Sequence, residues 1–278
     1  MTETVVIEWL LDSDPAIRWQ VMRDLTDQAP GVVAAERARV ATEGWGAQLL
    51  ALQAPDGLWA GKAWSHDWTD TFHVLELLRR LGLDPASGDA RRAIGLVREH
   101  VTWGDGSPWE NPWGDNAFFE GEVENGATVS SFATTINVVE GLLAYEQATG
   151  GSDRVGEARR RGDEYMLERR LFRRKSTGEV IDPSWLQFSF PHWYFYDVLR
   201  ALDYFRAADA RPDAQVAEAI AAVETNRAPD GRWPLQNVHP GASPVELDAG
   251  EGRPSRWNTL RAMRVLQWAN PPGQSAVQ

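Results

Sequence analysis

The sequence contains one unusual turn twice. Ala54–Trp59 reads APDGLW and Ala228–Trp233 reads APDGRW, with the two tryptophans 174 residues apart. A Pro-Asp-Gly turn needs the flexible backbone of glycine, which Gly57 and Gly231 supply. A specific turn that recurs at such a distance indicates internal repeats, and repeats decide which folds are open to the chain.

Five short segments also recur with a common pattern, in which a large apolar residue is followed by a polar one and, three positions later, by a charged one. They are Trp19–Leu25, Phe72–Leu78, Ile136–Leu142, Tyr196–Leu202 and Trp257–Met263. Their polar residues are separated by 53, 64, 60 and 61 positions, which is the length of a helix, a loop and a second helix. The chain is therefore predicted to be five αα-hairpins, or six, with this pattern in the second helix of each.

Helical periodicity dominates the sequence and supports this all-α prediction. Helices are expected over 3–12, 15–27, 31–53, 68–82, 87–101, 132–149, 153–172, 193–208, 212–227 and 255–269. Long segments rich in Gly, Pro, Trp and acidic residues separate them, and loops of such length are usually functional. We expect a single domain over 1–270 and a flexible tail over 271–278.

Composition restricts the function. The net charge of −12 disfavours nucleic acids and anionic membranes as partners, because both bind basic surfaces. The chain has no cysteine, which excludes disulfides, thiol catalysis and Cys-ligated zinc. No segment has the features of a signal peptide or the length and apolarity of a membrane span. A cytoplasmic protein is expected, as a monomer or weak dimer.

The first turn resembles a known family. Gly46, Leu49, Gln53, Gly57 and Trp59 match the G-x2-L-x3-Q-x3-G-x-W pattern of the QW repeats. These repeats mark the squalene-cyclase and protein-prenyltransferase superfamily. The resemblance covers 46–81 well and 227–233 in part, and it implies an α/α toroid. In that family the Gln and Trp of the motif connect neighbouring repeats, so the resemblance implies structural roles for Gln53 and Trp59.

The chemistry of that family is only partly present. Its cyclases protonate a polyene with an Asp-x-Asp-Asp-Thr motif, and the nearest segment here is Asp67-Trp68-Thr69-Asp70-Thr71. Thr69 occupies the place of the proton donor, so the enzyme class stays open. Asp67 and Asp70 are alternatively expected to cap the helix that follows them.

The repeats place polar residues at equivalent positions of the second helices. One predicted ring consists of Gln20, His73, Asn137, Asp197 and Asn258, and a second, three residues further on, of Arg23, Glu76, Glu140, Arg200 and Arg261. The rings either bridge neighbouring hairpins, with Glu76 and Glu140 offsetting Arg200 and Arg261, or line a central funnel.

Three loops add candidate site residues, because carboxylates, imidazoles and phenols among aromatic side chains can have shifted pKa values. The predicted catalytic residues are Asp197, His192, His73, Asp70, Glu122 and Tyr196. The predicted substrate-binding residues are Trp109, Trp113, Phe119, Glu120, Glu124, Tyr194, Arg256, Trp257, Asn258 and Asn137. Several of these, including His73, Asp197 and the acidic run Glu120–Glu124, are expected to converge on one pocket.

No cofactor and no metal are expected, since the five histidines lack metal-binding spacing and no nucleotide motif occurs. Three functions remain. The first is a terpenoid-cyclase-like enzyme that applies acid/base chemistry to a small, largely apolar, isoprenoid-like substrate in an aromatic-lined cavity. The second is a carbohydrate-active hydrolase or lyase, and the third is a non-catalytic toroid that binds a ligand or protein.

Overall fold

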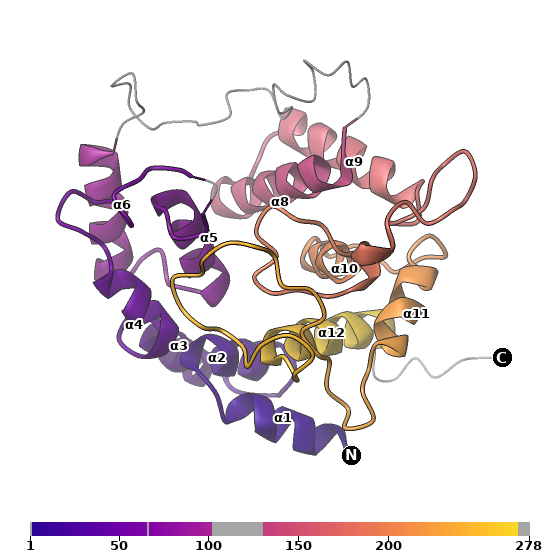
Figure 1. Ribbon diagram of the computed structural model, residues 1–278, viewed down its shortest axis with the longest axis horizontal. Coiled ribbons are helices and arrows are strands. Elements are labelled where there is room, and N and C mark those ends of the chain that lie inside the picture. Colours follow the sequence, from indigo (N-terminus) through magenta and orange to yellow (C-terminus); the bar gives the residue numbers. More distant parts are fainter. Residues whose placement is uncertain (1, 66, 102–129, 272–278) are drawn as a thin grey trace. The chain divides into compact units, whose positions relative to one another are not determined.

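The computed structural model describes residues 2–65, 67–101 and 130–271, and within them the predicted all-α class is confirmed (Figure 1). The helices are α1 (Glu3–Leu11), α2 (Pro15–Asp24), α3 (Pro30–Ala38), η1 (Arg39–Ala41), α4 (Gly44–Ala51), α5 (Thr71–Leu81), α6 (Gly88–His100), α8 (Phe132–Thr149), α9 (Asp153–Leu167), η2 (Pro183–Leu186), α10 (Val198–Ala207), α11 (Ala217–Thr225) and α12 (Arg256–Ala269). Elsewhere in these ranges the backbone forms only isolated β-bridges.

The helix expected over 31–53 is interrupted. A 3-10 turn follows α3, and α4 begins at Gly44, whose φ of +62° is left-handed. A Cβ at Gly44 would collide with the carboxylate of Asp14, which accepts hydrogen bonds from the amides of Ala16 and Trp45. Asp14 therefore starts α2, as Asp-Pro predicts, and also holds the break between α3 and α4.

The described residues form two compact units. Unit 1 comprises residues 1–112 and 228–260, and unit 2 comprises 113–227 and 261–278. Helix α12 contributes its first five residues to unit 1 and the rest to unit 2. The predicted extent of a single domain over 1–270 stays a prediction, as does the toroid.

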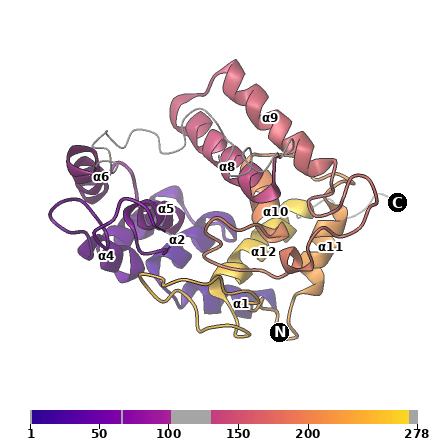
Figure 2. The ribbon, with the colours of Figure 1, turned by 45° about the horizontal axis from the view of Figure 1, so that its top comes forward.

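The most extensive helix contacts join helices that are consecutive in the chain. In unit 1, α2 packs on α3, and in unit 2, α8 packs on α9. The short turn Gly150–Ser152 connects α8 and α9, which lie side by side in Figures 1 and 2. In these two cases a repeated-pattern helix packs on the helix after it, because a short connection favours antiparallel neighbours, whereas α5 packs on α4, the helix before it.

The two APDG turns have the same local structure, both within unit 1. In each, the alanine amide donates to the carbonyl four residues later, at 2.9 Å, and the glycine amide donates back to the alanine carbonyl. Gly57 and Gly231 have φ values of +81° and +80°. Each turn ends in a buried Trp whose amide donates to a threonine hydroxyl at 3.0 Å, Thr71 on α5 or Thr259 on α12.

Gln53 and Trp59 each bond to a helix beside the first turn, while their role in connecting neighbouring repeats stays a prediction. The Trp59 indole is 1% exposed and donates to the carbonyl of Leu49 on α4 at 2.7 Å. The Gln53 amide donates to the carbonyls of Gly57 and of Ala93 on α6, both at 3.1 Å. At Gly57 a Cβ would come within 2.6 Å of the Leu96 carbonyl oxygen, so the turn can approach α6 only with glycine.

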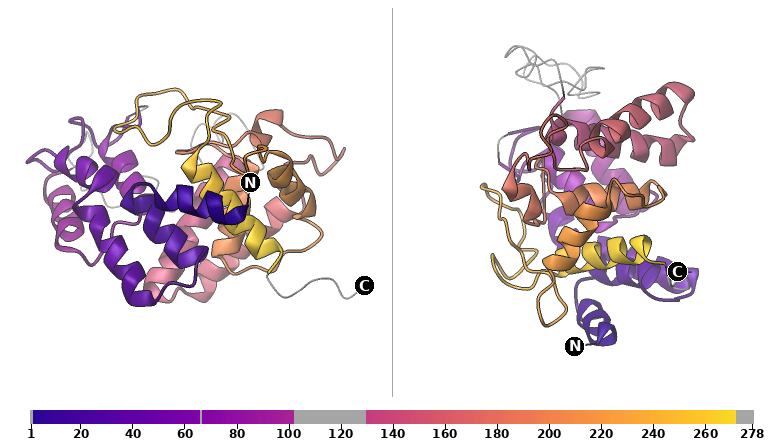
Figure 3. Two further views of the ribbon diagram at one scale, coloured as in Figure 1. Left: turned by 90° about the horizontal axis from the view of Figure 1, so that it is seen from below. Right: turned by 90° about the vertical axis from the view of Figure 1, so that its right-hand side faces the viewer.

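Residues 234–255 form a long irregular segment of unit 1, orange to yellow in Figure 3, before α12 begins. Val245 and Leu247 bury their side chains, and the amide of Leu235 donates to the carbonyl of Arg253. In the described parts of the chain, no helix combines the length and apolarity needed to cross a bilayer.

Candidate functional site

Asp70 and His73 form a buried acid–imidazole pair at the start of α5. The Nδ1 of His73 lies 2.7 Å from Oδ2 of Asp70, which is fully buried, while His73 is 6% exposed. The other carboxylate oxygen, Oδ1, accepts the backbone amide of His73 at 3.1 Å. A carboxylate held in this way fixes the orientation of the imidazole and places its proton on Nδ1, which leaves Nε2 as the basic nitrogen.

Local sequence explains this geometry. Asp70 is the N-cap of α5, as predicted, and its carboxylate also accepts the amide and hydroxyl of Ser65. Asp67 is exposed and does not cap the helix, and its carboxylate lies 4.0 Å from the amine of Lys62. Aromatic rings surround the imidazole: Trp68 and Phe72 make edge contacts at 4.9 and 5.2 Å between centroids.

Asp197 is the N-cap of α10 in unit 2, as Asp70 is the N-cap of α5 in unit 1. Its Oδ1 accepts the amide of Arg200 at 2.7 Å, and Oδ2 lies 3.4 Å from the amide and hydroxyl of Ser189. The Nη2 of Arg261 on α12 lies 3.8 Å from Oδ1 of Asp197, and the guanidinium of Arg261 donates to the Ser189 carbonyl. Burial raises the pKa of Asp197 despite the opposing charge of Arg261. These are the contacts of a residue that holds two segments together.

Arg200, from the second predicted ring, is 1% exposed and fully engaged by neighbours. Its guanidinium makes two hydrogen bonds to the carboxylate of Glu140, at 3.0 and 2.7 Å, and one to Oδ1 of Asn137. It also donates to the carbonyls of Trp193, Tyr194 and Phe195. Glu140 therefore offsets Arg200, one of the two arginines that the bridging alternative names.

Glu76 makes a different pairing from the predicted one, because its carboxylate contacts Arg79 and Arg80 of its own helix. Arginines three and four residues ahead lie on the same helix face and are the nearest cations.

The remaining predicted residues of unit 2 are engaged in internal contacts. Tyr196 is buried and donates from its hydroxyl to the carbonyl of Leu171, and burial raises its pKa well above the usual value. His192 is buried, with Nδ1 3.4 Å from the carbonyl oxygen of Trp193. The Tyr194 hydroxyl lies 3.4 Å from that of Thr134, and its carbonyl accepts from Asn137.

In unit 1 the three predicted residues at the start of α12 each contact other residues of the same unit. Arg256 donates to the carbonyls of Trp9 and Asp12 and lies over the Trp9 ring. Trp257 is buried against Trp45, with 6.1 Å between ring centroids. Asn258 donates to the carbonyl of Pro234 at 3.0 Å.

Sequence inspection missed Asp248, which accepts the Ser255 hydroxyl and the Arg256 amide. Burial raises the pKa of Asp248 to about 6, and its two hydrogen bonds oppose the shift. A carboxyl that titrates this close to neutrality can exchange protons under physiological conditions.

The structure brings Asp70 and His73 together, and separately Asn137 and Tyr194. His73 and Arg256 belong to unit 1, whereas Asp197, His192 and Tyr196 belong to unit 2. The predicted convergence of these residues stays a prediction. Six predicted site residues lie outside the described residues, namely Trp109, Trp113, Phe119, Glu120, Glu122 and Glu124.

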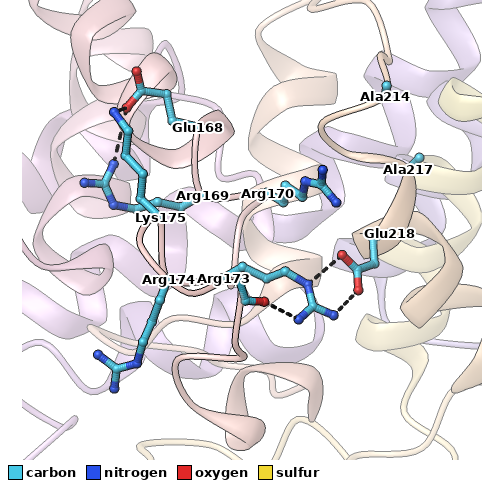
Figure 4. Close-up of a pocket in the computed structure, with 10 residues that line it drawn as sticks. Glu168, Arg169, Arg170, Arg173, Arg174, Lys175, Ala214, Ala217 and Glu218 are labelled. Carbon is cyan, nitrogen blue, oxygen red and sulfur yellow. Dashed lines mark hydrogen bonds and ion pairs between the residues drawn. The ribbon is translucent and has the colours of Figure 1, made fainter.

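A cavity of about 700 Å³ in unit 2 is lined by residues that the sequence search did not select. Arg169, Arg170, Arg173, Arg174 and Lys175 contribute to its walls, together with Glu168, Gly178, Ala214, Ala217 and Glu218 (Figure 4). The available indication was five cationic residues within seven positions of an acidic chain. No three His, Asp or Glu side chains in the described ranges are grouped so that they could hold a metal ion.

Searches of protein-family models, of curated proteins and of solved structures give no match to this chain. The candidate site therefore depends on its own geometry.

Proposed function

We propose that this protein is an acid/base enzyme in which His73, oriented by Asp70, transfers a proton to or from a small, largely apolar substrate. The observation that carries the proposal is the 2.7 Å contact between Nδ1 of His73 and the fully buried carboxylate of Asp70. An isoprenoid-like substrate and a toroidal framework are parts of the same proposal. They are supported by the aromatic rings of Trp68 and Phe72 and by the helix-connecting contacts of Gln53 and Trp59.

The reaction follows from the strength of the base. An isolated alkene is too weakly basic to take a proton from an imidazolium, so direct polyene protonation by this pair is disfavoured. A conjugated carbonyl compound has acidic hydrogens at its γ-carbon. Nε2 of His73 removes such a proton to give a dienolate and an imidazolium, and the imidazolium returns a proton to the same carbon or to the α-carbon.

The carboxylate of Asp70 stabilises the imidazolium in this cycle without accepting the proton, and it keeps the ring in one orientation. The nearby aromatic rings exclude water and favour an apolar substrate. Proton exchange or double-bond migration is thus the expected chemistry.

Proton exchange can be measured directly. The protein is incubated in D2O with citral or farnesal, and deuterium incorporation is followed by mass spectrometry. Cinnamaldehyde, which has no γ-hydrogen, is the negative control. We expect catalysed exchange with the two isoprenoid aldehydes and its loss, by about 10²–10⁴-fold, in His73→Gln.

Asp70→Asn keeps an oxygen that can cap α5 but removes the charge that stabilises the imidazolium, so exchange is expected to fall strongly while the fold is retained. Ser87→Ala, which removes the N-cap of α6, controls for helix-cap stability. Exchange rates equal in wild type and His73→Gln would refute the proposal. Cleavage of neutral oligosaccharides without exchange would favour the carbohydrate-active alternative.

A further inference from the structure

The cavity of unit 2 lies at a strongly cationic turn. Five cationic side chains and two carboxylates line it, which leaves a net charge of +3 in a chain whose net charge is −12. Because the chain as a whole has a negative net charge, a local concentration of arginines around a cavity needs a specific explanation. A volume of about 700 Å³ lies in the range of small-molecule sites.

The turn that carries these arginines is firmly anchored. Leu171 and Phe172 are buried, and the buried hydroxyl of Tyr196 donates to the Leu171 carbonyl. The amide of Ile181 donates to the Phe172 carbonyl, which pairs the two arms of the turn. The arginine backbone is thereby fixed before any ligand arrives, which lowers the entropy cost of binding.

The backbone is strained at the same place. Arg170 and Leu171 have φ values of +47° and +68°, in the left-handed region that residues other than glycine rarely adopt. Backbone strain of this kind clusters at functional sites, and Arg170 is one of the two strained residues.

The arginines differ in their internal partners. Arg173 is held by the carboxylate of Glu218 and by the Gly178 carbonyl, and Lys175 contacts Glu168. Within the described ranges, the exposed side chains of Arg170 and Arg174 form no hydrogen bond or ion pair. In Figure 4, Arg170 extends to the side of Ala217 and Glu218, as Arg173 does, whereas Arg174 extends away from them.

We propose that this cavity binds a small organic di- or oligophosphate, with Arg170 as its principal anchor. The negative charge of a diphosphate is about the amount needed to balance the net charge of +3 in the cavity. The planar guanidinium groups match phosphate oxygens in charge and geometry. Ala214 and Ala217 line the opposite wall and leave room for the organic part. The site is independent of the Asp70–His73 pair, which belongs to unit 1.

Isothermal titration calorimetry with inorganic pyrophosphate tests the proposal on the full chain. Pyrophosphate is expected to bind, and the affinity is expected to fall about tenfold in Arg170→Gln, because one charge-assisted contact is lost. Arg174→Gln is expected to lower it about threefold, as a more distant charge. Arg154→Gln is the matched control: this exposed arginine starts α9, about 20 Å from Glu168 along the helix, and should leave binding unchanged.

Three further measurements test what occupies the cavity. Raising NaCl from 50 to 500 mM should weaken pyrophosphate binding several-fold, and inorganic sulfate should bind at least tenfold more weakly. The proposal is overturned if pyrophosphate does not bind, or if Arg170→Gln and Arg154→Gln bind it equally. It is also overturned if poly-glutamate peptide binds through Arg170 while pyrophosphate does not, since the occupant would then be an acidic protein segment.

Discussion

Asp248→Asn is expected to stabilise the protein at neutral pH, although it removes a side chain with two good hydrogen bonds. Burial raises the pKa of Asp248 from 3.8 to about 6, so the folded state holds its proton more tightly than the unfolded state does. The stability associated with this proton is complete below pH 3.8 and is lost as the pH rises through 6. The difference of about two pKa units corresponds to roughly 3 kcal/mol as an upper bound.

Asparagine at this position can keep the important contacts. Its oxygen can accept the Arg256 amide as Oδ1 now does, and its amide can donate to the Ser255 hydroxyl, which now donates to Oδ2. The variant has no charge to bury. Its free energy of unfolding should therefore exceed that of wild type by up to about 3 kcal/mol at pH 7.5 and by little at pH 4.

Urea denaturation of both proteins between pH 4 and pH 8 measures this difference directly. Asp27→Asn removes an exposed carboxyl of the same unit and corrects for the change in net charge. A stability difference that stays constant across this range would refute the reasoning, as would a variant that loses stability relative to wild type with increasing pH.

Other substitutions test the remaining contacts by thermal and urea denaturation. Trp59→Ala should cost about 3–5 kcal/mol because the buried indole leaves a cavity, and an unchanged melting temperature would contradict its structural role. Arg200→Met should cost about 3–5 kcal/mol, since the buried hydrogen bonds of Arg200 to Glu140 and Asn137 would be lost, whereas Glu140→Gln should cost less. Asp197→Asn should raise the melting temperature at neutral pH, because burial raises the pKa of Asp197 despite Arg261 and asparagine has no charge to bury. An unchanged melting temperature with lost proton exchange would instead make Asp197 part of the site.

The repeated turn could be predicted from sequence because its determinants are local. Pro-Asp-Gly specifies a tight turn by itself, and both copies form the same hydrogen bonds. The helices were predictable for the same reason. Errors in the predicted helix boundaries occur where a contact with a residue distant in sequence determines where a helix ends. The break between α3 and α4 depends on Asp14, which lies thirty residues before Gly44. The sequence close to Gly44 therefore does not contain the residue that determines the break.

The polar ring positions could be predicted, but their partners could not. The repeat shows that Asn137 and Arg200 occupy equivalent helices, yet only packing brings Arg200 to Glu140 and Asn137 at once. Glu76 illustrates the limit, because its own helix offers two closer arginines. The basic turn 169–175 was missed because a search for repeated positions gives no weight to residues that occur in a single loop.

His73 differs from its counterparts in the first ring, and this leads to the final prediction. Gln20, Asn137 and Asn258 each donate an amide to a carbonyl of a segment distant in sequence, at Arg80, Tyr194 and Pro234. An amide performs this bridging role at every pH. His73 instead contacts the carboxylate that caps its own helix, and we propose that its imidazole is the ring member that moves a proton.

His73→Gln returns this position to the amide type of the ring, so it should be tolerated by the fold. Glutamine can donate to the carboxylate of Asp70 from a similar position, and the free energy of unfolding at pH 7 should change by about 1 kcal/mol or less. His73→Leu removes the imidazole from the buried carboxylate, which keeps only its bonds to Ser65 and to the backbone amide of residue 73, and should cost about 1–3 kcal/mol. If His73→Gln unfolds as easily as His73→Leu, the imidazole is needed for the fold. A stable His73→Gln protein without proton exchange would leave chemistry as the reason for histidine at this position.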